Sequence, residues 1–311
     1  MDAAPFLADI AEAPKGAVCA WLSAGDGVRI RAAHWRTGTK GTVLLFPGRS
    51  EYIEKYGPAA ADFAKRGYAM AVLDWRGQGI ADRLLDDPAP GHVGRFIDYQ
   101  KDVAAFLDFA RGEELPQPWF LVGHSMGGCI GLRAIHEGLP VRAVTFSAPM
   151  WGIRISTFLK PVARAMSSLA GLVRMDGRLA PSTSRTTYVL DTSFEDNLLT
   201  RDADMFAFMQ RQARAHPELT IGGPSLRWLS EALHETRALT SLATPMLPCL
   251  TVLGEAERIV DIPAIHSLMA RWQGATLELI PNAEHELMME GAAIRARFYD
   301  SAAKLFDAHR G

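Results

Sequence analysis

The sequence has little cysteine, no long apolar run and almost no net charge. Its 311 residues include three scattered cysteines, an odd set that excludes a disulfide framework and fits no zinc site. No stretch of about 18 apolar residues is present, so we expect no membrane-spanning segment. A formal net charge of −2 at pH 7 argues against a nucleic-acid partner. Residues 1–20 contain Asp2, Asp9 and Glu12 and lack the pattern of a signal peptide, so we expect a protein of a reducing compartment, the cytoplasm.

Segments typical of strands and helices alternate along the chain. A hairpin is predicted first, over Ala17–Leu22 and Val28–Trp35, with good turn residues between them. Six apolar runs follow, of the type that parallel strands covered on both faces have. They are Thr42–Phe46, Tyr68–Leu73, Trp119–Val122, Val141–Phe146, Cys249–Leu253 and Leu277–Ile280. Helix-period segments separate most of them, which predicts an α/β fold with a mostly parallel, doubly wound sheet and its site at the strands' carboxyl ends.

The alternation stops once, between Pro149 and Thr244. This stretch has no apolar run typical of a buried strand, and glycine and proline recur along it. We predict an inserted helical cap over the active edge of the sheet. The predicted organisation is a first part of the core over residues 1–149, the cap over 150–244, and the second part of the core over 245–311.

The strongest motif lies directly after the run Trp119–Val122. Residues 123–127 read Gly-His-Ser-Met-Gly, a G-x-S-x-G pattern between a predicted strand and a predicted helix. Small residues let the backbone turn sharply, so that the serine hydroxyl projects from the strand end as a nucleophile. The pattern predicts Ser125 as that nucleophile, and the alternative is a tight turn that happens to hold a serine.

A nucleophilic serine needs a base, and the base needs an acid that orients it. In this fold the base follows the last strand, and of nine histidines His285 lies in that loop. Residues 254–261 follow the preceding strand and offer the acid. The fourth position of the common G-x-x-D pattern is Glu257 here, with Asp261 and Glu255 as alternatives. Asp261 also fits the N-cap of a helix that begins at residue 262, because proline stands in the first turn of that helix.

Two backbone N–H groups are needed to hold an oxyanion. The first belongs to Met126, the residue after the nucleophile. The second is expected from the loop after the run Thr42–Phe46, where Gly48 permits close approach and the N–H of Arg49 is the natural donor. The side chain of Arg49 has two interpretations, contact with an anionic head group or an ordinary surface arginine.

Nine segments in chain order carry a resemblance to a known family. They are Phe46–Tyr52, Asp74–Gly79, Gly91–Tyr99, Gly123–Gly128, Ser147–Met150, Asn197–Thr200, Gly222–Pro224 with Trp228, Gly254–Asp261 and Ala283–Glu286. With them the chain resembles the bacterial lysophospholipase branch of the monoacylglycerol-lipase-like serine α/β-hydrolases. The segments span nearly the whole chain and include part of the predicted cap, which differs between branches of this fold.

The resemblance implies an α/β-hydrolase fold and hydrolysis of the single acyl ester of a lysophospholipid or monoacylglycerol through an acyl-enzyme. Carried over by position, Ser125 is the nucleophile, His285 the base and Glu257 the acid, and neither a metal nor another cofactor is required. Lipase relatives usually have aspartate at the position of Glu257, and a His-Gly pair at residues 47–48, where this chain has Pro-Gly. A short-chain carboxylesterase and a catalytically silent lipid-binding protein are the alternative functions.

A basic amphipathic segment in the predicted cap bears on contact with lipid. Its apolar residues fall on one helical face, and residues 151–180 carry five basic side chains against one acidic. The apolar residues are Val162, Ala165, Met166, Leu169, Leu172 and Val173. One interpretation is peripheral contact with the inner membrane, and the other is a cap helix that packs over an acyl pocket.

Overall fold

The computed structural model describes residues 1–154 and 176–311, so the predicted amphipathic segment lies outside the described part. Within that part, nine strands form one sheet in the order β1-β2-β3-β5-β4-β6-β7-β8-β9. From β5 to β9 in this order the strands are parallel, whereas β1, β2 and β3 pair antiparallel. The strands are β1 (Asp2–Ala3), β2 (Val18–Ser23), β3 (Arg29–Trp35), β4 (Thr42–Phe46), β5 (Ala69–Asp74), β6 (Trp119–His124), β7 (Val144–Ser147), β8 (Cys249–Gly254) and β9 (Thr276–Ile280).

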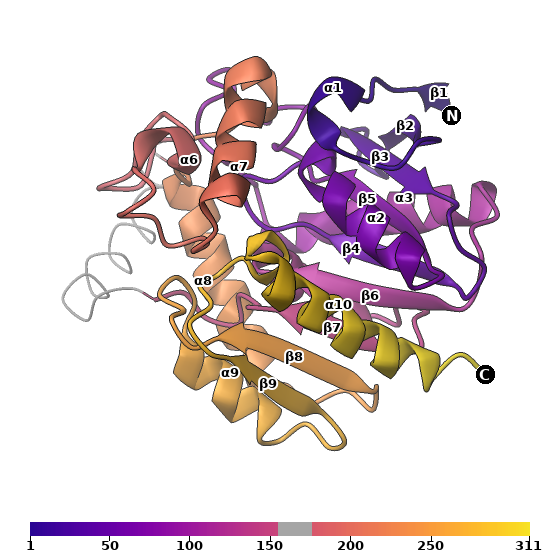
Figure 1. Ribbon diagram of the computed structural model, residues 1–311. Helices are drawn as coiled ribbons and strands as arrows, with labels where there is room; N and C mark the ends of the chain where they lie inside the picture. Colours follow the sequence, from indigo (N-terminus) through magenta and orange to yellow (C-terminus); the bar gives the residue numbers. More distant parts are fainter. Residues whose placement is uncertain (155–175) are drawn as a thin grey trace.

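Helices cover both faces of the sheet, with α2 and α10 on one face and α3 and α4 on the other (Figure 1). The α-helices are α1 (Ala8–Ala11), α2 (Gly57–Lys65), α3 (Tyr99–Gly112), α4 (Met126–His136), α6 (Tyr188–Asp191), α7 (Ala203–Ala215), α8 (Leu226–Ser241), α9 (Ile262–Met269) and α10 (Ala292–Asp307). Short 3-10 helices are η1 (Ile53–Tyr56), η2 (Phe96–Asp98), η3 (Pro217–Leu219) and η4 (Leu287–Met289).

Alternate side chains of each central strand enter two separate cores. In β4, Val43 and Leu45 pack in the cluster that contains residues of α2 and α10. Leu44 and Phe46 pack in the cluster that contains residues of α3 and α4. Because successive side chains of a strand point to opposite faces, a strand buried on both faces must be apolar throughout, as these runs are.

The predicted fold class is confirmed, and the predicted hairpin and six predicted strands are present with ends that differ by a few residues. The two-residue strand β1 was not predicted, because a pairing this short leaves no period in the sequence. Between residues 176 and 244 the structure holds α6, α7, η3 and α8, and no described segment there joins the sheet. Helices α6 and α7 contact each other and lie at one end of the molecule (Figure 1).

Among the described residues, the structure has no helix that combines the length and apolar character needed to cross a bilayer. The three cysteines are free and buried. Burial raises the pKa of the Cys19 thiol to about 12, so that thiol stays protonated at neutral pH.

Candidate active site

Ser125 lies at the sharp turn between β6 and α4. Its backbone has φ 48° and ψ −116°, a conformation that is strained for a residue with a Cβ. Small neighbours make the turn sterically possible. A Cβ at Gly127 would collide with the carbonyl of Phe46, and one at Gly128 would lie 2.6 Å from the Cβ of Pro149. The turn therefore presents the Ser125 hydroxyl at the carboxyl end of β6, as in a nucleophile elbow.

His285 is hydrogen-bonded to the carboxylate of Glu257. The two residues follow β9 and β8, parallel neighbours whose carboxyl ends meet at one edge. Nδ1 of His285 donates to Oε2 of Glu257 at 2.6 Å, and both side chains are buried. The other carboxylate oxygen, Oε1, accepts from the backbone N–H groups of Ile259 and Val260 at 2.6 and 3.1 Å. The carboxylate is thus held on both sides, and it fixes the orientation of the imidazole ring.

This pairing changes the pKa of both groups. Burial alone would raise the pKa of Glu257, but the His285 ring and the two backbone N–H groups outweigh burial and lower it below its usual value. Burial alone would lower the pKa of His285, but the carboxylate of Glu257, with smaller contributions from those of Glu286 and Glu51, outweighs burial and raises this pKa above the usual 6.5. The His285 ring is therefore a stronger base than a free imidazole.

The two alternative acids do not reach His285. Asp261 stands at the N-cap position of α9, with proline in the first turn, and its side chain accepts no capping hydrogen bond. Glu255 is exposed to solvent. In the described part of the chain, Glu257 is the carboxylate within ion-pair distance of His285.

The loop after β4 is supported by the turn after β5. The indole N–H of Trp75 donates to the carbonyl of Pro47 at 3.0 Å. The Gln78 amide bridges the loop, since its Nε2 donates to the Gly48 carbonyl at 3.2 Å and its Oε1 accepts from the Ser50 N–H at 2.9 Å. The Asp-Trp-Arg-Gly-Gln-Gly turn thus holds the loop that is predicted to supply an oxyanion donor.

Two backbone N–H groups in this region remain available to a ligand. The Gly48 N–H donates to the carboxylate of Glu51, and the Ser50 N–H is taken by Gln78. Between them, the Arg49 N–H has no acceptor in the described part of the chain. The Met126 N–H is the first of α4 and has no partner within its own helix. These are the two donors that the sequence analysis names.

Ser125 and His285 border one cavity of about 250 Å³. Residues with apolar side chains form much of its wall. They include Met150, Ile153, Leu199, Trp228, Leu229 and Val260. Between residues that the structure describes, no hydrogen bond joins the Ser125 hydroxyl to His285, and such bonds commonly tighten only when substrate binds. The site thus combines a hydroxyl, an imidazole–carboxylate pair and apolar surface.

A buried charged cluster that the sequence analysis did not predict adjoins His285. The ammonium group of Lys55 binds Glu51 at 2.7 Å and Glu286 at 2.6 Å. Nε2 of His124 lies 3.6 Å from Glu51, and the His124 ring centroid is 4.9 Å from that of His285. Two signals were available in the sequence, since Glu51 and Lys55 are one helical turn apart and Glu286 is next to His285.

This cluster has ligand atoms close enough together to hold a cation. Single atoms of Glu51, His124 and Glu286 lie within 4.8 Å of one another. Lys55 already supplies a positive charge there, because its ammonium group binds both carboxylates. Burial lowers the pKa of His124 to about 4, so its ring is neutral, and its Nδ1 donates to the Ser147 carbonyl at 3.0 Å. We therefore interpret the cluster as an ion-paired support for the site.

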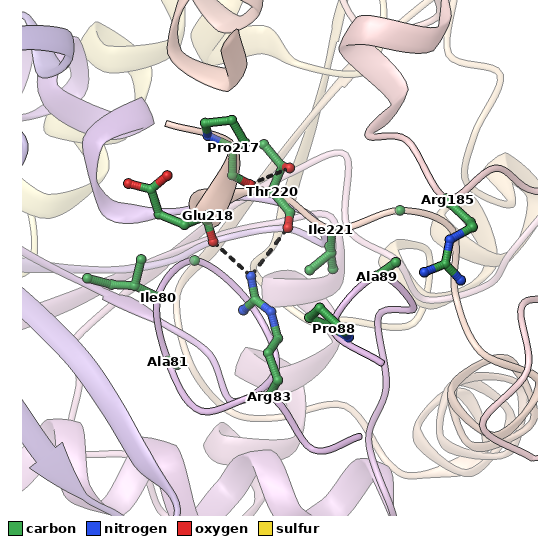
Figure 2. A pocket seen from close by; sticks show the side chains of 12 residues that line it. Ile80, Ala81, Arg83, Pro88, Ala89, Arg185, Pro217, Glu218, Thr220 and Ile221 are labelled. Atoms are coloured by element: carbon green, nitrogen blue, oxygen red, sulfur yellow. Dashed lines mark hydrogen bonds between the residues drawn. The ribbon is translucent and has the colours of Figure 1, made fainter. Parts of the chain in front are cut away.

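A second cavity, of about 500 Å³, lies between the loops 79–89 and 217–222 (Figure 2). Arg83 reaches across it, and its Nη2 donates to the carbonyls of Glu218 and Thr220 at 3.0 and 3.3 Å. Its described lining residues include no serine, cysteine or histidine. Gly222 lines this second cavity and also accepts from the Arg49 side chain, which borders the first.

Residues 37–292 match the model of the family described as Hydrolase_4, serine aminopeptidase S33. The matched span includes Ser125, Glu257 and His285, and it exceeds half of the chain. The chain belongs to this family. The hydrolase is 31% identical over 302 residues to lysophospholipase L2 of Escherichia coli, with 91% of this chain and 84% of that protein covered. It is 26% identical over 280 residues to the probable lysophospholipase L2 of Haemophilus influenzae, with 88% and 87% covered.

The fold of the hydrolase is shared with solved structures. A soluble variant of monoglyceride lipase from Saccharomyces cerevisiae, crystallised with a substrate analog, superposes with a TM-score of 0.72 at 20% identity. The superposition covers 93% of this chain and 95% of that one. The resemblance predicted from the sequence is confirmed, and the hydrolase has the α/β-hydrolase fold.

Proposed function

We propose that this hydrolase cleaves the single acyl ester of lysophospholipids or monoacylglycerols through an acyl-enzyme. The observation that carries the proposal is that Ser125 and His285 border one largely apolar cavity and that His285 is hydrogen-bonded to Glu257. An apolar wall suits an acyl chain, since each buried methylene contributes about 0.8 kcal/mol. Relatives whose names are lysophospholipase and monoglyceride lipase support the same substrate class.

The first half of the reaction forms the acyl-enzyme. Nε2 of His285 takes the proton of the Ser125 hydroxyl as Oγ bonds to the acyl carbonyl carbon. The carbonyl oxygen becomes an oxyanion, which the N–H groups of Arg49 and Met126 hold. The carboxylate of Glu257 stabilises the imidazolium that has formed. When the tetrahedral intermediate collapses, the ester C–O bond breaks and His285 gives its proton to the departing alcohol.

The second half regenerates the serine. Water enters, His285 takes one of its protons, and the hydroxide oxygen bonds to the acyl carbonyl carbon. Collapse breaks the bond between that carbon and Oγ, and the proton returns from His285 to Ser125. The products are a fatty acid and the glycerol-based alcohol, and no redox or metal step is involved.

We also propose that residues 150–244 form a cap that closes the acyl side of the cavity. Trp228 and Leu229 of α8, together with Leu199, already stand in the cavity wall. A cytoplasmic location with peripheral contact of this cap at the membrane would bring the site to its substrate.

The words serine aminopeptidase in the family description suggest peptides as a second substrate class. The α-ammonium group of a peptide would need a free carboxylate in the cavity, and both carboxylates of this cavity bind Lys55.

The activity is expected to rise with pH and to level off above the pKa of His285. Only the neutral ring accepts the serine proton, and the Glu257 carboxylate raises the pKa of His285 above 6.5. Protonation at lower pH therefore removes activity. The pH profile of kcat/KM checks this point. A Glu257→Gln variant loses the charge that raises this pKa, so its residual activity should level off at lower pH than that of the wild type. An unchanged profile in the variant would contradict the assignment.

A lipid panel tests the proposed function directly. Lysophospholipids, monoacylglycerols and simple esters are compared by mass-spectrometric product detection, with acyl chains from butyryl to palmitoyl. We expect kcat/KM to rise about fourfold for each added methylene until the cavity is filled. A preference for the shortest acyl chains would instead identify a short-chain carboxylesterase. Tight binding of the lipids without any product would identify a silent lipid-binding protein.

A further inference from the structure

The guanidinium group of Arg49 borders the cavity that contains Ser125. Its Nη2 donates to the carbonyl of Gly222 at 2.5 Å, and its Nη1 donates to Oγ of Ser50 at 3.1 Å. Its central carbon lies 5.4 Å from the centroid of the Trp228 ring, within the range of a cation–π interaction. These contacts hold the group in one place at the cavity wall.

The positive charge of Arg49 has no carboxylate partner within 4.0 Å in the described part of the chain. Residues 155–175 could not supply one, because they contain neither aspartate nor glutamate. Nε of Arg49 is buried and has no hydrogen-bond partner among the residues that the structure describes. Two buried arginines differ from half-buried Arg49, because Arg31 and Arg76 each bind two carboxylates.

The remaining charges at the cavity do not neutralise Arg49. The carboxylates of Glu51 and Glu286 border the same cavity, but both bind the ammonium group of Lys55. Burial lowers the pKa of Arg49 to about 10, so the group stays cationic at neutral pH. The Arg49 side chain is half-buried, so its charge is partly removed from water without a carboxylate partner, and an anionic ligand would offset that cost.

The position of this charge matches the layout of a lysophospholipid. The backbone N–H of Arg49 is the proposed donor to the acyl oxyanion, and the guanidinium lies one arginine side chain away from it. In a lysophospholipid the phosphate lies one glycerol unit away from the ester carbonyl. Arginine presents five N–H donors in a planar fork that fits phosphate oxygens, and the described residues accept from two of them.

We propose that the Arg49 guanidinium binds the phosphate of the substrate head group, so that the site prefers lysophospholipids to monoacylglycerols. The inference rests on the proposed function and narrows its substrate class. A charge-assisted hydrogen bond is worth about 1.5–3 kcal/mol, which corresponds to a preference of about ten- to a hundredfold.

The test compares two substrates that differ only in the phosphate, monooleoylglycerol and its lysophosphatidate. We expect Arg49→Gln to lower the ratio of kcat/KM for the phosphate-bearing lipid over the neutral one by about ten- to a hundredfold. Gly91→Ala is a second variant that perturbs the Arg49 guanidinium, without changing Arg49 itself. Its new Cβ would lie 2.8 Å from Nη2 and 3.3 Å from Nε of Arg49, so it should displace the guanidinium and lower the ratio in the same direction.

Arg83→Gln is the matched control. Like Arg49, Arg83 donates to backbone carbonyls of the segment 217–222, but it borders the second cavity (Figure 2). If Arg49 only anchored that segment, both variants should lose activity on the two lipids in parallel. We expect Arg83→Gln to leave the ratio unchanged. Melting temperatures of all variants show whether the fold is intact.

The possible outcomes separate this inference from the proposed function. If the wild-type protein cleaves neither lipid, the proposed function fails. If it cleaves both and Arg49→Gln leaves their ratio unchanged, or lowers both rates equally, the inference alone is overturned. Addition of inorganic phosphate tests whether the Arg49 guanidinium binds a free phosphate ion or the phosphate of a lipid head group. A melting temperature that rises with phosphate only when Arg49 is present, together with an unchanged substrate ratio, would indicate a free-anion site and overturn the head-group proposal.

Discussion

Replacing Ser125 with alanine is expected to lower kcat on lysophospholipid or monoacylglycerol by about a millionfold, the loss seen when a catalytic serine is removed. The substitution removes only the hydroxyl group, and no other serine or cysteine borders the cavity in the described part of the chain. Alanine keeps the Cβ and hence tolerates the positive φ of 48° about as well as serine does. The variant should therefore fold normally and bind lipid without cleaving it.

The control for this substitution is Ser182→Ala. Ser182 also has a positive φ, of 63°, and it is exposed and does not line the cavity. Product release by the two variants is measured by mass spectrometry, and their melting temperatures are compared with that of the wild type. We expect full activity in Ser182→Ala and none above background in Ser125→Ala. Lipid hydrolysis by a folded Ser125→Ala protein at more than a few per cent of the wild-type rate would refute the nucleophile assignment.

Glu257→Gln is expected to lower kcat by about ten-thousandfold, as loss of the triad carboxylate does in serine proteases. The reason lies in the hydrogen bonds of this carboxylate. Its Oε1 accepts from the N–H groups of Ile259 and Val260, and the glutamine carbonyl oxygen would keep those bonds. The amide nitrogen then faces Nδ1 of His285 as a donor. The ring is held in the wrong tautomer, with the proton on the nitrogen that should face Ser125.

Asp261→Asn is the comparison for the acid. Asp261 lies on the same loop at the start of α9, and its side chain makes no capping hydrogen bond. We expect this variant to keep activity within a fewfold of the wild type and to melt at nearly the same temperature. A large loss in Asp261→Asn together with a small loss in Glu257→Gln would mean that a different arrangement of this loop is the active one.

The architecture was predictable because it depends on short-range patterns. A central strand such as β4 is apolar on both faces, and the pattern survives in the sequence even when the strand ends are uncertain by a few residues. The elbow at Ser125 was predictable for a related reason, since the steric demand of the turn leaves small residues at fixed spacing. Chain order then placed His285 and the loop containing Glu257 at the same edge.

The environment of the site could not be predicted in the same way. The ion pair between Lys55 and Glu286 joins residues more than 200 positions apart, and only the folded chain adds it to the local ion pair between Lys55 and Glu51. The contacts of the Arg49 side chain also depend on residues that are distant in the sequence. Its side chain was open to two interpretations, and the structure shows it half-buried, in contact with Gly222 and Trp228 and without a carboxylate partner in the described part of the chain. Local sequence shows residue types, whereas pairing depends on tertiary contacts.

The central claim is that Ser125 is a nucleophile activated by His285. It is tested most directly by reaction with a fluorophosphonate probe, which phosphonylates an activated serine and whose site is found by peptide mass spectrometry. We predict one adduct, on the peptide that contains Ser125, absent in Ser125→Ala and formed far more slowly in His285→Ala. An adduct at another residue, or no adduct in a preparation that hydrolyses lipid esters, would contradict the account.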